Sequence, residues 1–105
     1  MDNKDKPPLK RLKTLLTSGN LWLYILSVLE ENKSSYPYIL DSKIEEKFGF
    51  KPNKIMIYIV IYKLETEGLL ESKMDGRRKI MRITKSGTQT LKEAREYMKK
   101  LGERL

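Results

Sequence analysis

The sequence contains no cysteine and no histidine. The chain therefore has no thiolate nucleophile, no imidazole general base and none of the ligands of ordinary zinc sites. Its carboxylates fall in helix-surface patterns such as Glu30-Glu31 and Glu45-Glu46, and it has no glycine-rich phosphate loop. We therefore expect a protein that is not an enzyme and that uses no metal and no cofactor.

Long apolar runs are also missing. No segment approaches the roughly 18 to 20 apolar residues that cross a bilayer, and the polar start, Met1–Asp5, is unlike a signal peptide. The lack of cysteine agrees with a reducing compartment. We expect a cytoplasmic protein with no membrane partner, and a length of 105 residues suits one self-sufficient domain.

Positive charge is abundant and unevenly distributed. The net charge is +8, of which residues 1–13 contribute +3 and residues 73–85 contribute +5, whereas residues 30–50 carry −2. Such a local excess is typical of a protein that binds a polyanion. The alternative is a solvated surface from an organism that favours charged residues, since abundant Ile, Lys and Glu with a single Gln hint at a thermophile.

Apolar spacing predicts three helices in the first half of the chain. Residues 1–8 are polar and are expected to form a disordered tail. Leucines at helical spacing follow in residues 9–16, a strongly apolar helix is expected over 21–31, and Pro37 is suited to the first turn of a third helix that ends near Gly49.

Residues 52–67 are ambiguous in their local pattern. β-branched and aromatic residues alternate between Ile55 and Tyr62, which favours a strand. Pro52-Asn53 can begin a helix and Gly68 can end one, and Ile57, Val60, Ile61 and Leu64 would then form its inner face. Propensity is a weak guide that packing often overrides, and we predict a helix, mostly from the elements that follow in the chain.

A hairpin and a final helix complete the chain. Asp75-Gly76 separates two extended runs within residues 69–84, which is a strong hairpin signal. Thr84 or Ser86 can cap a last helix that runs to the end, and Ser86 with Gln89 fits a capping box.

These elements predict a mostly α fold with a small β-hairpin, a winged helix-turn-helix. We assign residues 9–85 to the winged helix-turn-helix domain and residues 86–105 to a C-terminal dimerisation helix. In this arrangement the recognition helix, about residues 53–67, enters the major groove of double-stranded DNA. The basic wing, residues 73–82, reaches the backbone or the minor groove.

The chain also resembles the PadR family of winged-helix repressors over about residues 15–91. The resemblance is carried by residues 15–19 with the apolar helix after them, by Tyr36-Pro37-Tyr38-Ile39, by residues 57–70, by Gly76-Arg77-Arg78-Lys79, and by residues 83–87. It implies a DNA-binding transcriptional regulator in which Tyr58 contacts the DNA backbone. Some members bind drugs with an aromatic of the last helix, but the only tryptophan here is Trp22 in an early helix, so no ligand pocket is carried over. A small-molecule effector is therefore unknown.

The candidate DNA-binding residues are mostly cationic or aromatic, as phosphate contacts require. They are Asn53, Lys54, Tyr58, Tyr62, Lys63, Lys73, Arg77, Arg78, Lys79 and Arg82. Arg77, Arg78 and Lys79 are expected to project together from the hairpin tip. Asn53 has a second interpretation as a helix cap, and Tyr58 as a packing residue. Met56 and Ile59 are expected to be exposed together, either to touch thymine methyl groups or to bury against a partner.

A homodimer is predicted from the last helix. Leu91, Ala94, Met98, Leu101 and Leu105 recur at alternating three- and four-residue steps, which is an a/d stripe. We expect this stripe and Trp22 to form the dimer interface. The alternative is that the stripe packs back on the helix containing Leu12 and Leu16. A different class of function, a winged helix that docks proteins in a transcription or replication assembly, is favoured by the apolar recognition helix and opposed by the basic wing.

Overall fold

The computed structural model describes residues 4–105, and residues 1–3 of the expected tail lie outside it. The first helix, α1 (Pro7–Leu16), begins two residues before the expected boundary at residue 9. Pro7 and Pro8 occupy its first turn, where a missing N–H costs no helical hydrogen bond. None of the residues of α1 is buried, so this helix extends from the body of the protein.

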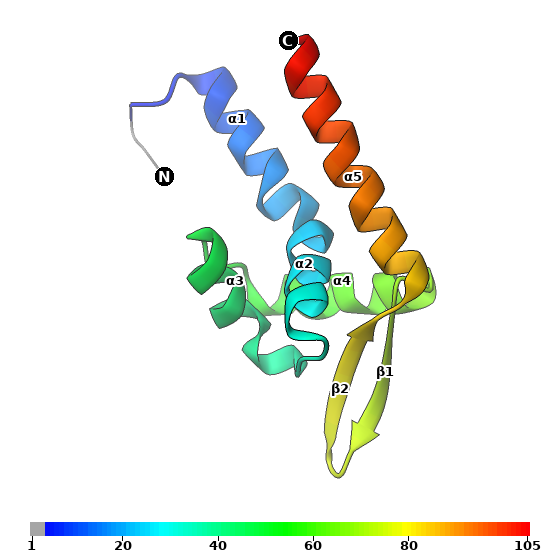
Figure 1. The fold of residues 1–105 in the computed structure, drawn as a ribbon. Coiled ribbons are helices and arrows are strands. Elements are labelled where there is room, and N and C mark those ends of the chain that lie inside the picture. Colours follow the sequence, from blue (N-terminus) through cyan, green and yellow to red (C-terminus); the bar gives the residue numbers. More distant parts are fainter. Residues whose placement is uncertain (1–3) are drawn as a thin grey trace.

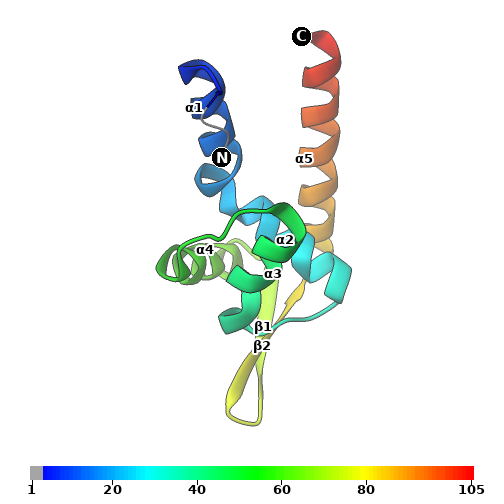
Figure 2. The ribbon, with the colours of Figure 1, turned by 90° about the vertical axis from the view of Figure 1, so that its left-hand side faces the viewer.

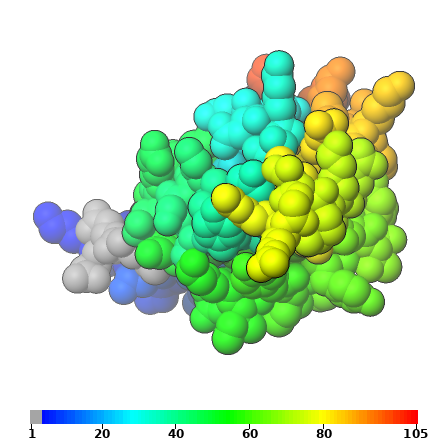
Figure 3. All heavy atoms as spheres, turned by 90° about the horizontal axis from the view of Figure 1, so that it is seen from below, coloured from blue at the N-terminus to red at the C-terminus, as the bar shows by residue number. Residues whose placement is uncertain are grey.

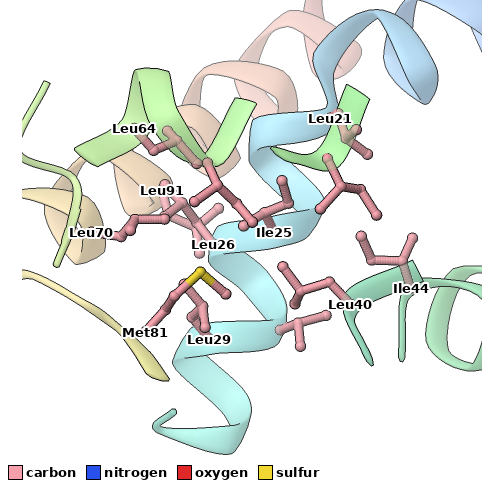
Figure 4. Packing of buried hydrophobic residues seen from close by; sticks show 13 residues of the cluster. Leu21, Ile25, Leu26, Leu29, Leu40, Ile44, Leu64, Leu70, Met81 and Leu91 are labelled. Carbon is pink, nitrogen blue, oxygen red and sulfur yellow. The ribbon is translucent and has the colours of Figure 1, made fainter. Parts of the chain in front are cut away.

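Helix α2 (Leu21–Asn32) follows the short 3₁₀ helix η1 (Ser18–Asn20) and runs through the centre of the core. Five of its side chains are buried, and they point to both sides of the helix axis (Figure 4). The other core residues come from each later α-helix and from both strands: Leu40, Ile44, Ile57, Ile61, Leu64, Leu70, Met81 and Leu91. One apolar core therefore unites residues 21–91.

Residues 37–66 form the helix-turn-helix. The 3₁₀ helix η2 (Pro37–Ile39) leads into α3 (Leu40–Phe48), and α4 (Lys54–Thr66) follows after a short loop. The predicted helix over 52–67 is confirmed, and the strand-like pattern was misleading. The first turn of α4 is stabilised by a side-chain cap. Asn53 Oδ1 accepts hydrogen bonds from the amides of Ile55 and Met56, at 2.8 and 3.2 Å.

The C-terminal end of α4 is equally well defined. Gly68 has a φ of +76°, in the left-handed region that favours glycine. The amide of Leu69 donates to the carbonyl of Leu64, and the amide of Gly68 to that of Glu65. This is a Schellman motif, which satisfies carbonyls at the helix end and turns the chain into the hairpin.

The wing is a two-stranded antiparallel hairpin of β1 (Leu70–Asp75) and β2 (Arg78–Ile83). Asp75 pairs with Arg78, so the loop residues are Gly76 and Arg77 and not Asp75-Gly76 as the sequence suggested. Gly76, at φ +66°, takes the position that requires a positive φ. Ser35 adds an isolated bridge to Met81, which ties the base of the wing to the loop after α2.

Helix α5 (Lys85–Arg104) starts from a close contact with the base of the wing. Thr84, and not Ser86, is its N-cap: the Thr84 hydroxyl accepts from the amide of Gly87 at 3.0 Å and donates to the carbonyl of Gly68 at 2.7 Å. A Cβ at residue 87 would lie 2.0 Å from the carbonyl oxygen of Leu69. Only glycine permits this approach.

The elements divide the molecule into a body with projections on opposite sides (Figures 1 and 2). Helices α1 and α5 extend to one side, and the wing extends to the other. Figure 2 places α4 at an edge of the body, with the wing below it. The winged helix-turn-helix fold predicted from the sequence is therefore confirmed.

One expectation about apolar runs needs correction. Taken together, Pro7–Asn32 is long and apolar enough to cross a membrane by length and composition, with a mean hydropathy of 1.2 over its best 18-residue window. Within it, η1 separates the two α-helices, and α2 is the central helix of the core. The apolar residues of α2 are explained by their packing in the core. The remaining apolar residues of Pro7–Asn32 are mainly the exposed leucines of α1.

Candidate DNA-binding surface

The outer face of α4 is apolar and exposed. Ile57, Ile61 and Leu64 are buried in the core as predicted, and Val60, the fourth residue of the predicted inner face, is half-buried against it. The opposite side of the helix carries Ile55, Tyr58, Ile59 and Tyr62, with exposed fractions of 70, 50, 44 and 72%. We call these four residues the α4 outer face. They line a shallow open hollow together with Lys63.

Met56 is exposed but does not belong to this face, although the sequence grouped it with Ile59. It lies on the flank of α4 and lines a separate hollow with Trp22 and Val60. The reason is the helical period: each residue turns about 100° around the axis, which carries Met56 away from Ile55 and past Ile59 toward Val60. Trp22 is half-buried against the core, and its Nε1 donates to Asn20 Oδ1 at 3.3 Å.

Tyr38 in η2 links the start of α4 to the wing. Lys54 Nζ donates to the Tyr38 carbonyl at 3.2 Å, and Arg78 Nη1 donates to the Tyr38 hydroxyl at 3.4 Å. The Tyr36 and Tyr38 rings stack at 5.8 Å, and the Arg78 guanidinium lies 5.3 Å from the Tyr36 centroid. Lys54 also lies 3.6 Å from the buried carboxylate of Asp41. Two cations from distant parts of the sequence are thereby held beside one tyrosine.

The wing cations do not project together. Neighbouring strand residues face opposite sides, so Arg78 lies against Tyr36 while Lys79 Nζ pairs with Glu65 Oε1 of α4 at 2.5 Å. Within residues 4–105, Arg77, Lys73 and Arg82 form no ion pair and no side-chain hydrogen bond. Arg77 occupies the loop, and the other two lie along the strands. These three cations are therefore unpaired and available to phosphates.

The remaining candidates have mixed positions. Asn53 is a helix cap, so its carboxamide oxygen is engaged while the residue stays exposed. Lys63 is exposed on the flank of α4, between the α4 outer face and the Trp22 hollow. Among residues 4–105, no group of three acidic side chains is placed to hold a metal ion.

The predicted dimer stripe is largely uncovered. Leu91 is buried and Ala94 is half-buried, but Met98, Leu101 and Leu105 have exposed fractions of 39, 45 and 98%. The leucines of α1 are exposed too. Helix α5 therefore leaves the leucines of α1 largely uncovered, although Leu16 lines a hollow together with Arg95 and Met98 of α5. Beyond Leu91, Arg95 Nη1 also lies 3.2 Å from Glu30 Oε1.

Tyr36 and Tyr38 are the residues of this surface that were not named as candidates from the sequence. They stood only in the motif Tyr36-Pro37-Tyr38-Ile39, which carried the resemblance. Tyr36 also donates from its hydroxyl to Asp75 at 3.2 Å, which places the only acid of the wing tip against η2. The signal that pointed to them was the pair of aromatics next to a helix start.

Comparison with known proteins supports the fold. A PadR family transcriptional regulator from Eggerthella lenta superposes with a TM-score of 0.76 at 26% identity, covering 91% of this chain and 87% of that one. A transcriptional regulator from Clostridium thermocellum gives 0.70 at 27% identity, over 83% and 93%. A winged-helix DNA-binding protein from STIV gives 0.72 at 23% identity, over 81% and 92%. A comparison with curated protein sequences gave no match.

The family assignment rests on the sequence itself. The profile of the transcriptional regulator PadR-like family matches residues 25–93, which include most of α2, the helix-turn-helix, the wing and the start of α5. This is more than half of the chain, and the function of the family is regulatory and not enzymatic. The chain belongs to the PadR-like family of transcriptional regulators.

Proposed function

We propose that this regulator is a homodimer that binds a specific double-stranded DNA sequence. Residues 53–67 lie in the major groove, and the wing, residues 73–82, lies on the backbone or in the minor groove. The observation that carries the proposal is the position of Tyr38 between Lys54 and Arg78, because it holds a cation at the start of α4 beside a cation of the wing, and such side chains contact DNA phosphates. A cytoplasmic, nucleoid-associated location is part of the same proposal.

The geometry suits a duplex. A major groove about 12 Å wide admits one helix. Helix α4 lies at an edge of the body (Figure 2), and its outer face is exposed within residues 4–105. Viewed from the wing side, the green atoms of the helix-turn-helix and the yellow atoms of the wing form one continuous surface (Figure 3). Arg77, Lys73 and Arg82 are free to neutralise phosphates at its rim.

The uncovered stripes of α1 and α5 support the dimer. Met98, Leu101 and Leu105 continue the a/d spacing past the body, and Leu9, Leu12 and Leu15 are at least 42% exposed. Helix α1 has ten residues and only residues 92–104 of α5 follow its buried Leu91. Isolated helical segments shorter than roughly 12 to 15 residues are marginal in water, so both projections would gain stability from a partner. A two-fold axis between the α5 helices would set two α4 helices roughly 34 Å apart on a palindromic site.

Selection of bound duplexes from a random DNA pool tests the proposal. We expect enrichment of a palindrome whose half-sites lie about one helical turn apart. A pool that shows salt-dependent binding but no enriched sequence would reduce the function to non-specific binding. A failure to retain any duplex would overturn the proposal.

The apolar α4 outer face favours a second candidate, a protein-docking winged helix. Such a module would bury Ile55, Tyr58 and Ile59 against a partner and would have no need of free cations on the wing. It predicts that loss of Arg77 and Arg78 leaves partner binding unchanged. Variants that lack Arg77 and Arg78 therefore distinguish the two functions, because they should weaken DNA binding but not protein docking.

A further inference from the structure

The α4 outer face has an unusual chemistry for a surface that reads DNA. From Lys54 to Leu64 the helix contains no Asn, Gln, Arg, Asp, Glu, Ser or Thr. Guanine is commonly read by paired donors of Arg or Lys, adenine by Asn or Gln, and cytosine by a carboxylate. The polar groups of the outer face itself are the hydroxyls of Tyr58 and Tyr62, each at the end of a long ring.

Apolar side chains can still read one base directly. In the major groove only thymine presents a methyl group, and aliphatic side chains recognise it by contact. Ile55 and Ile59 are one turn apart on the same face, with 70 and 44% of their surface exposed. Because four helical residues span about 6 Å and one base step about 3.4 Å, a helix that lies along the groove presents two branched aliphatic groups to bases about two steps apart.

The charges around this face favour DNA over a protein as its occupant. Lys54 and Lys63 flank it, Arg78 lies beyond Lys54 across Tyr38, and the nearest acid on the helix, Glu65, is paired with Lys79. The α4 outer face thus has an apolar centre and a cationic rim. The major groove is complementary to it, because thymine methyl groups lie on the floor of the groove and a row of phosphates lies on each side. A protein partner would have to supply acidic groups opposite this cationic rim, whereas every DNA duplex carries phosphates there.

We propose that Ile55 and Ile59 select thymine at defined positions of the half-site through its 5-methyl group. This inference rests on the proposed function, and it names what the recognition helix reads. Tyr58 and Tyr62, between and beside the two isoleucines, direct their hydroxyls to the flanking phosphates. The half-site is then rich in A·T pairs, and Met56, on the other flank of α4, contributes nothing to base choice.

The test uses the duplex selected above and removes single methyl groups. Each thymine of one half-site is replaced in turn by deoxyuridine, which keeps the base pair and loses only the methyl. We expect at least two positions at which affinity falls about fourfold, the size expected for one buried methyl group. Deoxyuridine outside the half-sites should leave the affinity unchanged.

Protein variants link the loss to the residues. In Ile59→Ala the deoxyuridine penalty should disappear at one position, and in Ile55→Ala at another, because the methyl then has no side chain to touch. Met56→Ala, on the same helix turn but off the outer face, should keep the full penalty at both. All three side chains are exposed, and circular dichroism checks that each variant is folded.

Three outcomes oppose the inference, and they are distinguishable. Full affinity for every deoxyuridine duplex, or selected half-sites dominated by G·C pairs, would overturn thymine reading while leaving DNA binding intact. Penalties that persist in Ile55→Ala and Ile59→Ala would assign the methyl contact to other residues. A protein that binds no duplex at all would overturn the proposed function and this inference together.

Discussion

Arg78, the first residue of β2, donates from Nη1 to the hydroxyl of Tyr38 at 3.4 Å, a contact between residues 40 positions apart. The Tyr36 ring lies beneath the same guanidinium at 5.3 Å. The wing is thus held against η2 by one cation and two stacked tyrosines. The orientation of Arg78 is set before any DNA is bound.

Tyr38→Phe should weaken DNA binding more than it weakens the fold. The ring stack with Tyr36 survives, so the free energy of unfolding should fall by less than about 1 kcal/mol, the net value of one hydrogen bond. Arg78 then has to be ordered on binding, at an entropy cost of about 1 kcal/mol, or roughly fivefold in affinity. Urea unfolding and duplex titration measure the two effects. Tyr97→Phe on α5 is the control, and equal affinity of the two variants would contradict the prediction.

Loss of the wing cations should weaken binding to every sequence. Replacing Arg77, Arg78 and Lys79 by Ala should flatten the salt dependence by about one unit of logarithmic slope for each phosphate that the variant no longer neutralises. Because Lys79 is paired with Glu65, its single replacement should cost less than that of Arg77. The matched control removes three charges from α5, at Lys92, Lys99 and Lys100. If the triple variant keeps the wild-type affinity for DNA and the wild-type salt dependence, the wing does not contribute to DNA binding and the protein-docking function is supported.

Gly87→Ala should destabilise the fold by about 2 kcal/mol, the usual cost of overpacking. The new Cβ would clash with the carbonyl oxygen of Leu69, and because this is a backbone atom, no change of rotamer can relieve the clash. Gly102→Ala, near the end of the same helix, meets nothing within 4 Å and should be neutral or slightly stabilising. Thermal unfolding of both variants separates the steric effect from helix propensity, and a wild-type melting temperature for Gly87→Ala would contradict it.

The double variant Met98→Glu with Leu101→Glu should be monomeric. Two carboxylates in the a/d stripe of α5 would have to be desolvated in a dimer, whereas both positions are partly exposed in the single chain. Light scattering at micromolar concentration measures the mass, and Lys99→Glu with Lys100→Glu controls for added negative charge. A monomeric wild type would refute the dimer, and a dimeric double variant would place the interface elsewhere.

Tyr24 should make stability fall at high pH. Burial raises the pKa of its hydroxyl above the ordinary value of 10.0, and the hydroxyl donates to the Leu16 carbonyl at the end of α1. The unfolded chain loses this proton first, so the stabilisation is complete below about pH 10 and is lost as the pH rises through the folded pKa. Tyr24→Phe keeps the edge contacts with Phe48 and Phe50, at 4.8 and 4.9 Å in the wild type.

Urea unfolding between about pH 9 and 11, on either side of the ordinary tyrosine pKa, is the measurement. The stability gap between wild type and Tyr24→Phe should narrow as the pH rises, since only the wild type has this proton to lose. Tyr62→Phe, at a residue 72% exposed, should follow the wild type throughout. A gap that stays constant with pH would show that the Tyr24 hydroxyl does not contribute in this way.

The sequence predicted the elements well because their ends carry strong local signals. The strand-like run in residues 55–62 was recognised as a helix from Asn53 and Gly68, and both residues perform the expected capping role. The hairpin was predicted at the right place, but its loop lies one residue later than predicted. The dipeptides Asp75-Gly76 and Gly76-Arg77 both contain a glycine that can adopt a positive φ, so the glycine alone does not decide between them. Register depends on pairing across the strands, which a dipeptide does not define.

Composition and pattern alone determined the winged-helix class, the basic wing and the absence of histidine and cysteine chemistry. Only the tertiary structure decided which cations are free: Arg77 is unpaired, whereas Arg78 lies against Tyr38 and Lys79 against Glu65. It also separated Met56 from Ile59, which the sequence had placed together. The physical reason is that helix periodicity and strand alternation decide which face of an element a side chain lies on. The groups that this side chain contacts come from segments far away in the chain, and only folding brings them together.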